Sequence, residues 1–490
     1  MLEPDSNQII KNYYKGTIDY PTAFRLLIFI QRYLHIRQPD SDNVNSLNNL
    51  EKIEMSDDDY FDLLVDLFLT TRREPRDIAG KLLFENFPER SIKPIIEFLN
   101  DEFSRFPFLL AFVFDKLWYT EKEEWKDLRG KVEDLLQKKI NRLMGAGVIH
   151  EEAVILALLE KFTDKKFEEL AYDRFGRITG GSLAHFKLNR KGRITVLYMC
   201  PHSDPRRLYY IPKDIDRLRY LEELKIENFS LEIIPGSIGN LRKLKHLDLC
   251  YNHINGIPDS IGKLKSLRHI DLSYNCIKEI PESIGLLKGL RYADLTYNRL
   301  QEIPESIGLL KNLKNLYLNC NEIEKIPVSI GKLVSLKELN FHMNKIEMMP
   351  KSIRNLVNLN LLSLGGNRIE SVPEEIKGLK NLESLGFGGN NLDKIPEWIG
   401  ELRKLKSLSF SDNNIKELPD FITRLTSLVS LDLSNTKIKS IPRDFHKLTS
   451  LRRIPTENVL ISEADREQIV KLLKDNRIRN KKKNITMFSH

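Results

Sequence analysis

A proline returns every 23 residues through almost half of the chain. Eleven of the 21 prolines form this series: Pro212, Pro235, Pro258, Pro281, Pro304, Pro327, Pro350, Pro373, Pro396, Pro419 and Pro442. The hexamer IPESIG occurs twice at the same interval, at Ile280–Gly285 and at Ile303–Gly308. A strict period of this length is typical of a linear array in which each unit packs on its neighbours. The chain length of 490 residues fits an array better than one compact domain.

The unit Leu313–Ser335 shows what each repeat requires. Leu316 and Leu318 alternate with polar residues, which predicts a short strand with its leucines on one face. Pro327 cannot donate a hydrogen bond to a strand partner, so the Ile-Pro pair predicts a bend. The following Ser-Ile-Gly-x-Leu segment predicts a tight convex turn or short helix. We expect Gly331 to supply a left-handed backbone there.

An asparagine recurs three residues after the last strand leucine. We expect these amides to bond the backbone of neighbouring turns and form a ladder, because an unpaired buried amide costs roughly 1–3 kcal/mol. The predicted ladder is Asn252, Asn275, Asn298, Asn321, Asn344, Asn367, Asn390 and Asn413. The first and last units carry Phe229 and Thr436 at this position, as expected of atypical end units.

The pattern LxxLxLxxNxIxxIPxxIGxLxx resembles the 23-residue "typical" class of the leucine-rich repeat family. The resemblance runs from near Arg193 to near Pro455. It implies an α/β fold, a curved solenoid with a parallel β-sheet on its concave face. The class is similar to intracellular Ras-group-related scaffolds, which implies protein–protein interaction, a role in signalling and a cytoplasmic location. A small GTPase is one partner that this resemblance would allow, and the sequence names no partner.

Three parts of the chain are predicted: an α-helical domain at 1–185, a solenoid of about ten full repeats with degenerate ends at 193–455, and a C-terminal part at 456–490. The segment Arg193–Met199 predicts an extra first strand. Ser462 with Asp465 predicts the start of a capping helix that is followed by a loose basic tail.

The N-terminal part has no repeat and no recognisable motif. Amphipathic spacing predicts these helices: Pro21–Ile36, Arg76–Asn86, Ile92–Phe103, Phe108–Trp118, Trp125–Leu143, Glu151–Phe162 and Lys165–Phe175, with another beginning near Ser56. The segment Ile178–Phe186 is interpreted as a hinge into the array.

Side chains between and just after the strand leucines are expected to line the concave face. The position between the leucines is acidic in three consecutive units, at Asp248, Asp271 and Asp294. The residue just before the ladder asparagine is tyrosine in the same units, at Tyr251, Tyr274 and Tyr297. The bordering aromatic and imidazole side chains are Tyr292, Tyr317, His246, His269 and His342.

Strands lie about 4.8 Å apart, so the three tyrosines should stack beside the three aspartates. Tyrosine is enriched in binding hot spots, and the acids favour a basic partner. We therefore predict a protein-binding surface here. The alternative is ordinary repeat consensus copied by duplication. Later units, from Ser363 to Ser411, carry glycine and serine and predict a smooth face.

No catalytic, cofactor or metal motif occurs, and the chain is predicted to be non-enzymatic without a cofactor. The four cysteines form no CxxC pair and are interpreted as free thiols of a reducing compartment. Neither a secretory signal nor an apolar run of about 20 residues is evident. The basic stretch Lys471–Lys483 supports an alternative function, binding to an anionic surface or a nucleic acid, although the acidic concave face disfavours nucleic acid there.

Overall fold

The computed structural model describes residues 134, 136–163, 166–169, 171–172, 178–179, 184–200 and 211–487. The chain forms two compact units, one of Met1–Leu117 with Glu121–Leu128, the other of Trp118–Thr120 with Arg129–His490. Every described residue belongs to the second unit. The helices predicted before residue 125 lie outside the described residues. Among the described helices, none has the length and apolar character that crossing a membrane requires.

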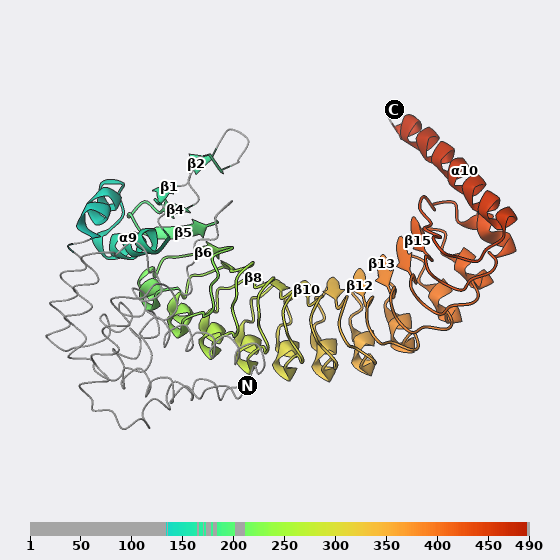
Figure 1. Ribbon diagram of the computed structural model, residues 1–490, viewed down its shortest axis with the longest axis horizontal. Coiled ribbons are helices and arrows are strands. Elements are labelled where there is room, and N and C mark those ends of the chain that lie inside the picture. Colours follow the sequence, from blue (N-terminus) through green and yellow to red (C-terminus); the bar gives the residue numbers. More distant parts are fainter. Residues whose placement is uncertain are drawn as a thin grey trace, which may run out of the picture. The chain divides into compact units, whose positions relative to one another are not determined.

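One sheet of thirteen strands runs through the described part of the second unit, in the order β1-β4-β5 and then β6 to β15 in sequence order. Figure 1 shows the repeat strands along the inner side of the coils and the short helices along the outer side. The repeat strands are β6 (Glu223–Ile226), β7 (His246–Asp248), β8 (His269–Asp271), β9 (Tyr292–Asp294), β10 (Asn315–Tyr317), β11 (Glu338–Asn340), β12 (Leu361–Ser363), β13 (Ser384–Gly386), β14 (Ser407–Ser409) and β15 (Ser430–Asp432). Successive strands are parallel and pair residues 23 apart, such as Leu247 with Ile270, so the predicted α/β solenoid is confirmed.

A five-residue 3-10 helix follows each proline of the series. These helices are η3 (Lys213–Arg217), η4 (Gly236–Asn240), η5 (Asp259–Lys263), η6 (Glu282–Leu286), η7 (Glu305–Leu309), η8 (Val328–Lys332), η9 (Lys351–Asn355), η10 (Glu374–Gly378), η11 (Glu397–Glu401), η12 (Asp420–Arg424) and η13 (Arg443–Lys447). Pro281, for example, has φ −68° and immediately precedes η6. Proline suits this place because its fixed φ is compatible with a helix start and its missing N–H would have no helical acceptor.

The glycine of the Ser-Ile-Gly segment has a different role from the predicted one. Its φ lies outside the left-handed region in every repeat that carries it. A Cβ added at Gly285 would lie 2.6 Å from the carbonyl oxygen of Ser306 in the next coil. The expectation of a left-handed backbone is therefore wrong. At Gly285 glycine is required because the neighbouring coil approaches too closely for a side chain.

The left-handed backbone instead occurs just before each ladder asparagine. Tyr251, Tyr274 and Tyr297 have φ values of 55°, 54° and 53° there, and Gly366 and Gly389 have 65° and 68°. This conformation costs a residue with a Cβ roughly 1–2 kcal/mol. It ends the strand and turns the chain toward the asparagine.

The asparagine ladder is confirmed. Asn298 donates from Nδ2 to the carbonyl oxygens of Leu272 and Leu295 at 2.9 and 3.1 Å, and its Oδ1 accepts the N–H of Ile277 at 2.9 Å. All eight asparagines are 5–9% exposed. At the last position the Thr436 hydroxyl donates within its own turn, to the carbonyl of Leu433 at 2.7 Å.

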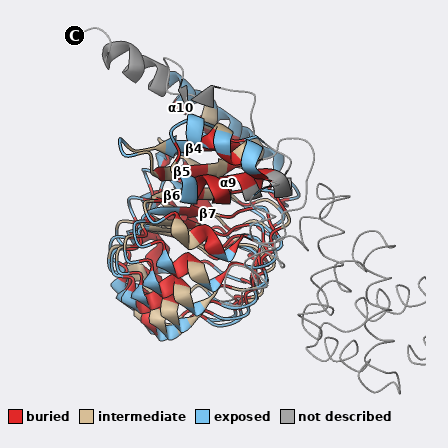
Figure 2. Ribbon diagram, turned by 90° about the vertical axis from the view of Figure 1, so that its left-hand side faces the viewer, coloured by how far each residue is buried: buried red, intermediate tan, exposed pale blue. Residues whose placement is uncertain are grey.

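A cap covers the N-terminal end of the sheet. Residues 136–145 are helical, and helix α9 (His150–Thr163) agrees with the predicted Glu151–Phe162 helix. Strands β4 (Ala184–Leu188) and β5 (Ile194–Met199) form an antiparallel pair, and β5 pairs in parallel with β6. The predicted extra strand at Arg193–Met199 is thereby confirmed. Buried positions run through α9 and strands β5 to β7 (Figure 2).

Two expectations for this region are wrong. The segment predicted as a helix at Lys165–Phe175 contains strands β1 (Glu168–Glu169) and β2 (Ala171–Tyr172). The predicted hinge at Ile178–Phe186 contributes β3 (Ile178–Thr179) and part of β4. The reason is tertiary: β1 pairs with β4, and β2 pairs with β3. Pairing at a sheet edge outweighs a local helix preference.

Buried carboxylates hold the cap together. Glu160, which is 2% exposed, accepts the N–H of Phe167 at 2.7 Å and pairs with Arg142. Glu152 accepts the N–H of Ile194, the first residue of β5, at 2.6 Å. Burial raises the pKa of Glu152, and the nearby Arg193 opposes that rise. The described cap therefore belongs to the same compact unit as the repeats, whereas the sequence placed the boundary near residue 185.

Helix α10 (Glu463–Met487) covers the C-terminal end. Ser462 caps it by accepting the N–H of Asp465 at 3.1 Å, and Ile469 and Leu472 are buried, as predicted. Asn476 donates to the carbonyl oxygens of Leu448 and Leu451, both at 2.9 Å. The helix continues through the basic stretch, so the expectation of a loose tail is wrong for residues 471–487. Helix extension from a docked first part is favourable where neither glycine nor proline interrupts it.

Candidate protein-binding surface

The register of the sheet aligns the outward-facing side chains in columns. Each strand has two outward-facing positions. The later one is occupied by Lys225, Asp248, Asp271, Asp294 and Tyr317 on β6 to β10. We call Asp248, Asp271 and Asp294 the aspartate column. The position two residues earlier contains Glu223, His246, His269, Tyr292 and Asn315. The two columns lie side by side because alternate residues of a strand face the same way.

Tyr251, Tyr274 and Tyr297 form the tyrosine ladder. The ring centroids of Tyr251 and Tyr274 are 4.2 Å apart, with the planes inclined by 9°. Those of Tyr274 and Tyr297 are 4.4 Å apart, inclined by 16°. The three side chains are 53%, 38% and 47% exposed. Both faces of Tyr274 are covered by its neighbours, so the ladder presents ring edges and hydroxyl groups.

Backbone geometry decides where the tyrosine ladder lies. Each tyrosine comes three residues after an aspartate of the column, and a continuing strand would point it toward the core. The left-handed φ at each tyrosine ends the strand and leaves the ring exposed. The ladder therefore lies just beyond the strand ends.

A second aromatic row lies on the strands themselves. His269 stacks on Tyr292 with 4.1 Å between centroids and an angle of 7°. His246 and His269 are 5.8 Å apart and tilted, as are Tyr292 and Tyr317 at 5.5 Å. Burial and the neighbouring His246 lower the pKa of His269, which favours its neutral form. Burial and a hydrogen bond to Glu338 raise the pKa of Tyr317 to about 12.

The first oxygen of each aspartate bonds to the residue two positions later. Asp248 Oδ1 accepts the N–H of Cys250 at 3.2 Å. Asp294 Oδ1 accepts the N–H of Thr296 at 2.9 Å. In Asp271, Oδ1 accepts both the N–H and the Oγ–H of Ser273, at 2.9 and 2.7 Å. These bonds fix the orientation of the three carboxylates relative to the backbone of the sheet.

The second carboxylate oxygen, Oδ2, has a different partner in each of the three aspartates. Asp248 Oδ2 lies 3.0 Å from the Lys225 ammonium, and Asp294 Oδ2 accepts a hydrogen bond from Tyr292 at 3.2 Å. Among the described residues, Asp271 Oδ2 accepts no hydrogen bond. Burial and the flanking Asp248 and Asp294 raise the pKa of Asp271 to about 6, against two bonds from Ser273 that lower it. The middle of the column is thus a carboxylate that pairs with no cation among the described residues.

The remaining predicted site residue lies apart. His342 is on the coil of β11, two strands beyond β9, which carries Asp294. Its ring lies against Gly365, where an added Cβ would meet His342 Nδ1 at 2.8 Å. The structure therefore brings together the predicted tyrosines, aspartates, His246 and His269, but not His342. The glycine- and serine-lined half begins at this point.

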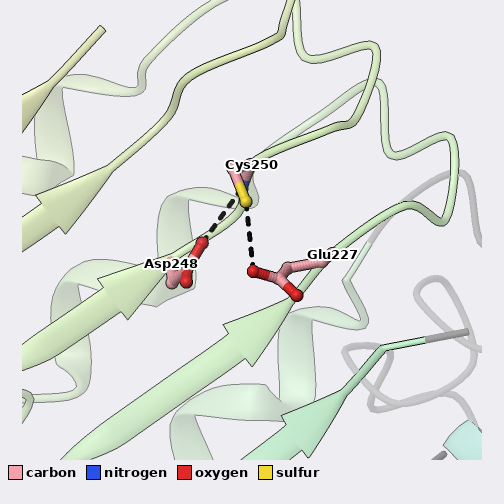
Figure 3. A group of neighbouring side chains, drawn as sticks. All are labelled: Glu227, Asp248 and Cys250. Atoms are coloured by element: carbon pink, nitrogen blue, oxygen red, sulfur yellow. Dashed lines mark hydrogen bonds between the residues drawn. The ribbon is translucent and has the colours of Figure 1, made fainter. Parts of the chain in front are cut away.

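Sequence reasoning missed a polar cluster at the start of the repeats (Figure 3). Cys250 donates from Sγ to Glu227 Oε1 at 3.2 Å, and Lys225 lies 2.5 Å from Glu227 and 3.0 Å from Asp248. Cys200 directly follows Met199, which pairs with Ile226, so the strand register places Cys200 next to Glu227. Reading two positions beyond Asp248 along the strand direction would have shown Cys250, but Cys200 precedes Glu227 by 27 residues and lies outside the 23-residue period.

Comparison with known proteins agrees with this architecture. The family described as leucine-rich repeat region matches residues 250–349, 284–383 and 341–476. The chain is a member of the leucine-rich repeat family. Proteins of this family commonly mediate protein–protein interactions and are typically non-enzymatic modules. The Ras-group subclass stays a prediction.

Solved structures include similar chains from several sources. A leucine-rich repeat protein of Leptospira interrogans is 30% identical over 54% of this chain and 85% of its own, with a TM-score of 0.42. An internalin of Listeria monocytogenes is 23% identical over 57% and 85%, with a TM-score of 0.47. A plant peptide hormone receptor in complex with RGF2 is 27% identical over 56% and 48%, also with 0.47. A search among curated proteins found no match.

Proposed function

We propose that this protein is a non-enzymatic scaffold that binds a protein partner on the tyrosine ladder and the aspartate column. The observation that carries the proposal is the pairing of three exposed, stacked tyrosines with a central carboxylate, Asp271, that lacks a cation. A basic segment of the partner would supply that cation. The role belongs to a reducing compartment, since all four cysteines are free, and we place it in cytoplasmic signalling.

The tyrosines are not required by the core. They are exposed, and each occupies a left-handed position where later coils have glycine, at Gly366 and Gly389. Keeping a tyrosine there costs backbone strain without burying the ring. Such strain is expected at sites kept for binding. Stacked rings lose little conformational entropy on binding, so the surface is pre-organised for a partner.

The charge of the surface specifies the partner's chemistry. Its acidic side chains are Glu223, Glu227, Asp248, Asp271, Asp294 and Glu338. Lys225 is the one lysine or arginine at the described outward strand positions of β6 to β11, which leaves a formal charge of −6 + 1 = −5 with histidines neutral. Complementary charge steers association and excludes acidic partners. A basic face or peptide therefore fits this surface.

The decisive experiment compares two triple variants. Replacing Tyr251, Tyr274 and Tyr297 by glycine preserves the turn, because Gly366 and Gly389 occupy the same position in later coils. The matched control replaces three exposed side chains away from the concave face, Leu286, Leu309 and Val334, by alanine. Partners captured from the source cytosol are identified and then titrated against each purified variant.

The proposal expects a partner whose binding is lost in the tyrosine variant and kept in the control. We expect the single change Tyr274→Gly to weaken that binding by about 1–3 kcal/mol, the magnitude of an aromatic hot spot. Equal binding by both triple variants would contradict the surface assignment. Binding that survives but falls steeply with salt would favour the basic residues of α10 instead.

A further inference from the structure

Helix α10 has two faces, and the fold uses one of them. Ile469, Leu472 and Asn476 lie on the face that docks on the last coil, where all three are buried. Positions four residues apart fall on one side of a helix, and Val470 and Ile478 follow one another along the side away from that coil. These two side chains are 49% and 55% exposed. The outer face of α10 therefore carries apolar side chains that the described part of the chain leaves uncovered.

The outer face of α10 is also basic. Lys471, Lys474 and Arg477 are exposed beside the two apolar residues, and none of the three forms an ion pair with another described residue. From Val470 to the end of the helix at Met487, the sequence has seven lysines and arginines against one acid, Asp475, which is a formal charge of +6. A helix face that combines apolar residues with cations is typical of a segment that binds an acidic, partly apolar surface.

The tyrosine ladder and the aspartate column have the complementary composition. They present exposed rings beside carboxylates, and Asp271 pairs with no cation among the described residues. The spacing agrees as well. A helix rises about 1.5 Å per residue, so Lys471, Lys474 and Arg477 follow one another at about 4.5 Å along the axis. Neighbouring strands lie about 4.8 Å apart, so a helix that crosses β7 to β9 would bring successive cations to successive aspartates.

A chain cannot place its own α10 on its own tyrosine ladder. The ladder belongs to the coils of β7 to β9, whereas α10 docks on the coil that follows β15 (Figure 1). Six strand spacings, roughly 29 Å in all, separate β9 from β15. Val470 directly follows the buried Ile469, so it stays at the last coil. A helix that occupies the ladder has to come from another molecule.

We propose that the outer face of α10 in one copy of this chain binds the tyrosine ladder and the aspartate column of a second copy. Val470 and Ile478 would lie against the tyrosine rings, and Lys474 would supply the cation for Asp271. The inference rests on the proposed function, because it takes the same surface and names a second copy as the partner. The two contacting surfaces differ, so a pair of copies keeps one free helix face and one free ladder, and larger oligomers can form.

Sedimentation velocity of the purified full-length chain tests the pairing. We expect oligomers that grow with protein concentration and become weaker as salt is raised, because salt screens the charge pairs. The helix variant carries Lys471→Glu, Lys474→Glu and Arg477→Glu. Glutamate is a strong helix former and leaves the docked face unchanged. The helix variant and the tyrosine-to-glycine variant should each self-associate at least about tenfold more weakly than the wild type.

Mixing the two variants is the sharpest test, because each keeps the surface that the other lacks. An equimolar mixture should form a one-to-one dimer with the affinity of the wild type and grow no further, since both remaining surfaces of that dimer are mutated.

The control variant makes the same change in net charge on the outer side of the coils, where exposed lysines lie on η5, η8 and η9. It carries Lys263→Glu, Lys332→Glu and Lys351→Glu and should self-associate like the wild type. Circular dichroism verifies that every variant is folded.

Two results would overturn the pairing of copies. One is a wild-type chain that stays monomeric up to about 100 μM, or a mixture of the two variants that is no larger than its components. The other is self-association that persists in the tyrosine variant, since the copies would then meet through another surface. The proposed function fails by a different result, namely a captured partner that binds the tyrosine variant and its alanine control equally.

Discussion

Asp271 shows, at the scale of a residue, how the proposed binding surface can reduce stability. Its carboxylate is partly buried between two others, and its pKa is raised to about 6 from 3.8. The folded chain therefore holds this proton more tightly than the unfolded chain. The stability that it contributes is fully present below about pH 4 and is lost as the pH rises through about 6. A partner cation would restore favourable charge at neutral pH.

Asp271→Asn should stabilise the protein at neutral pH and weaken partner binding. A shift of this size equals about 3 kcal/mol for a fully buried group, and partial exposure reduces it to about 1 kcal/mol. The Asn side chain keeps an oxygen for Ser273. Denaturant unfolding at about pH 4 and about pH 7 checks this, because the gain should appear only at the higher pH. An equal effect at both values would show that charge is not the cause.

Gly285→Ala tests the close approach of neighbouring coils. The added methyl group would lie 2.6 Å from the Ser306 carbonyl oxygen, so we expect a loss of about 1–3 kcal/mol in the free energy of unfolding. Gly378→Ala is the control, since its nearest atom lies 3.7 Å away, on Arg354. It should be neutral or slightly stabilising. Similar losses in both variants would contradict the steric account.

At the scale of the element, one repeat is a short strand, an asparagine turn, an Ile-Pro bend and a 3-10 turn. None of these is stable alone, since a three-residue strand such as Asn315–Tyr317 has few bonds of its own. Each becomes stable because the neighbouring coil completes its hydrogen bonds. The asparagine ladder is the clearest example: each amide donates to its own coil and to the preceding one.

Asn321→Ala should destabilise the array by roughly 1–3 kcal/mol, because it leaves the N–H of Leu300 and the carbonyl of Leu295 without that partner. Asn312→Ala is the matched control. Its amide is exposed and donates to the Lys288 carbonyl at 2.8 Å, so the expected change is within about 0.5 kcal/mol. Thermal denaturation of the two variants measures the difference. Equal unfolding temperatures would show that the ladder does not stabilise the array.

At the scale of the whole molecule, the repeats need covers at both ends. The helix–sheet cap of α9, β4 and β5 closes one end, and α10 closes the other. Uncovered coils would expose apolar residues and unpaired strand edges, which favour aggregation.

A fragment of residues 129–490 should therefore remain soluble and unfold cooperatively. One that begins at Arg193 lacks α9 and β4, leaves β5 as an exposed edge and should aggregate or lose structure in its first coils. Circular dichroism and light scattering of the two fragments measure this difference. Equal solubility and helix content of the two fragments would instead support a domain boundary near residue 185, as the sequence predicts.

Much of the fold could be read from the sequence because its interactions repeat at a constant interval. The strand leucines, the Ile-Pro bend, the asparagine ladder and the alignment of Asp248, Asp271 and Asp294 all follow from the 23-residue period. A local motif that recurs without a slip determines register, and register places side chains in columns.

Only the tertiary structure decided the rest, where the period ends or the backbone departs from a strand. Pairing at the sheet edge made strands of residues within Lys165–Phe175, and docking on the last coil carried α10 through the basic stretch. A positive φ, which the sequence does not indicate, exposed the tyrosine ladder. The pairing of β5 with β6 placed Cys200 beside Glu227 across an irregular interval. Each depends on contacts with a different segment of the chain, and local sequence carries no record of those contacts.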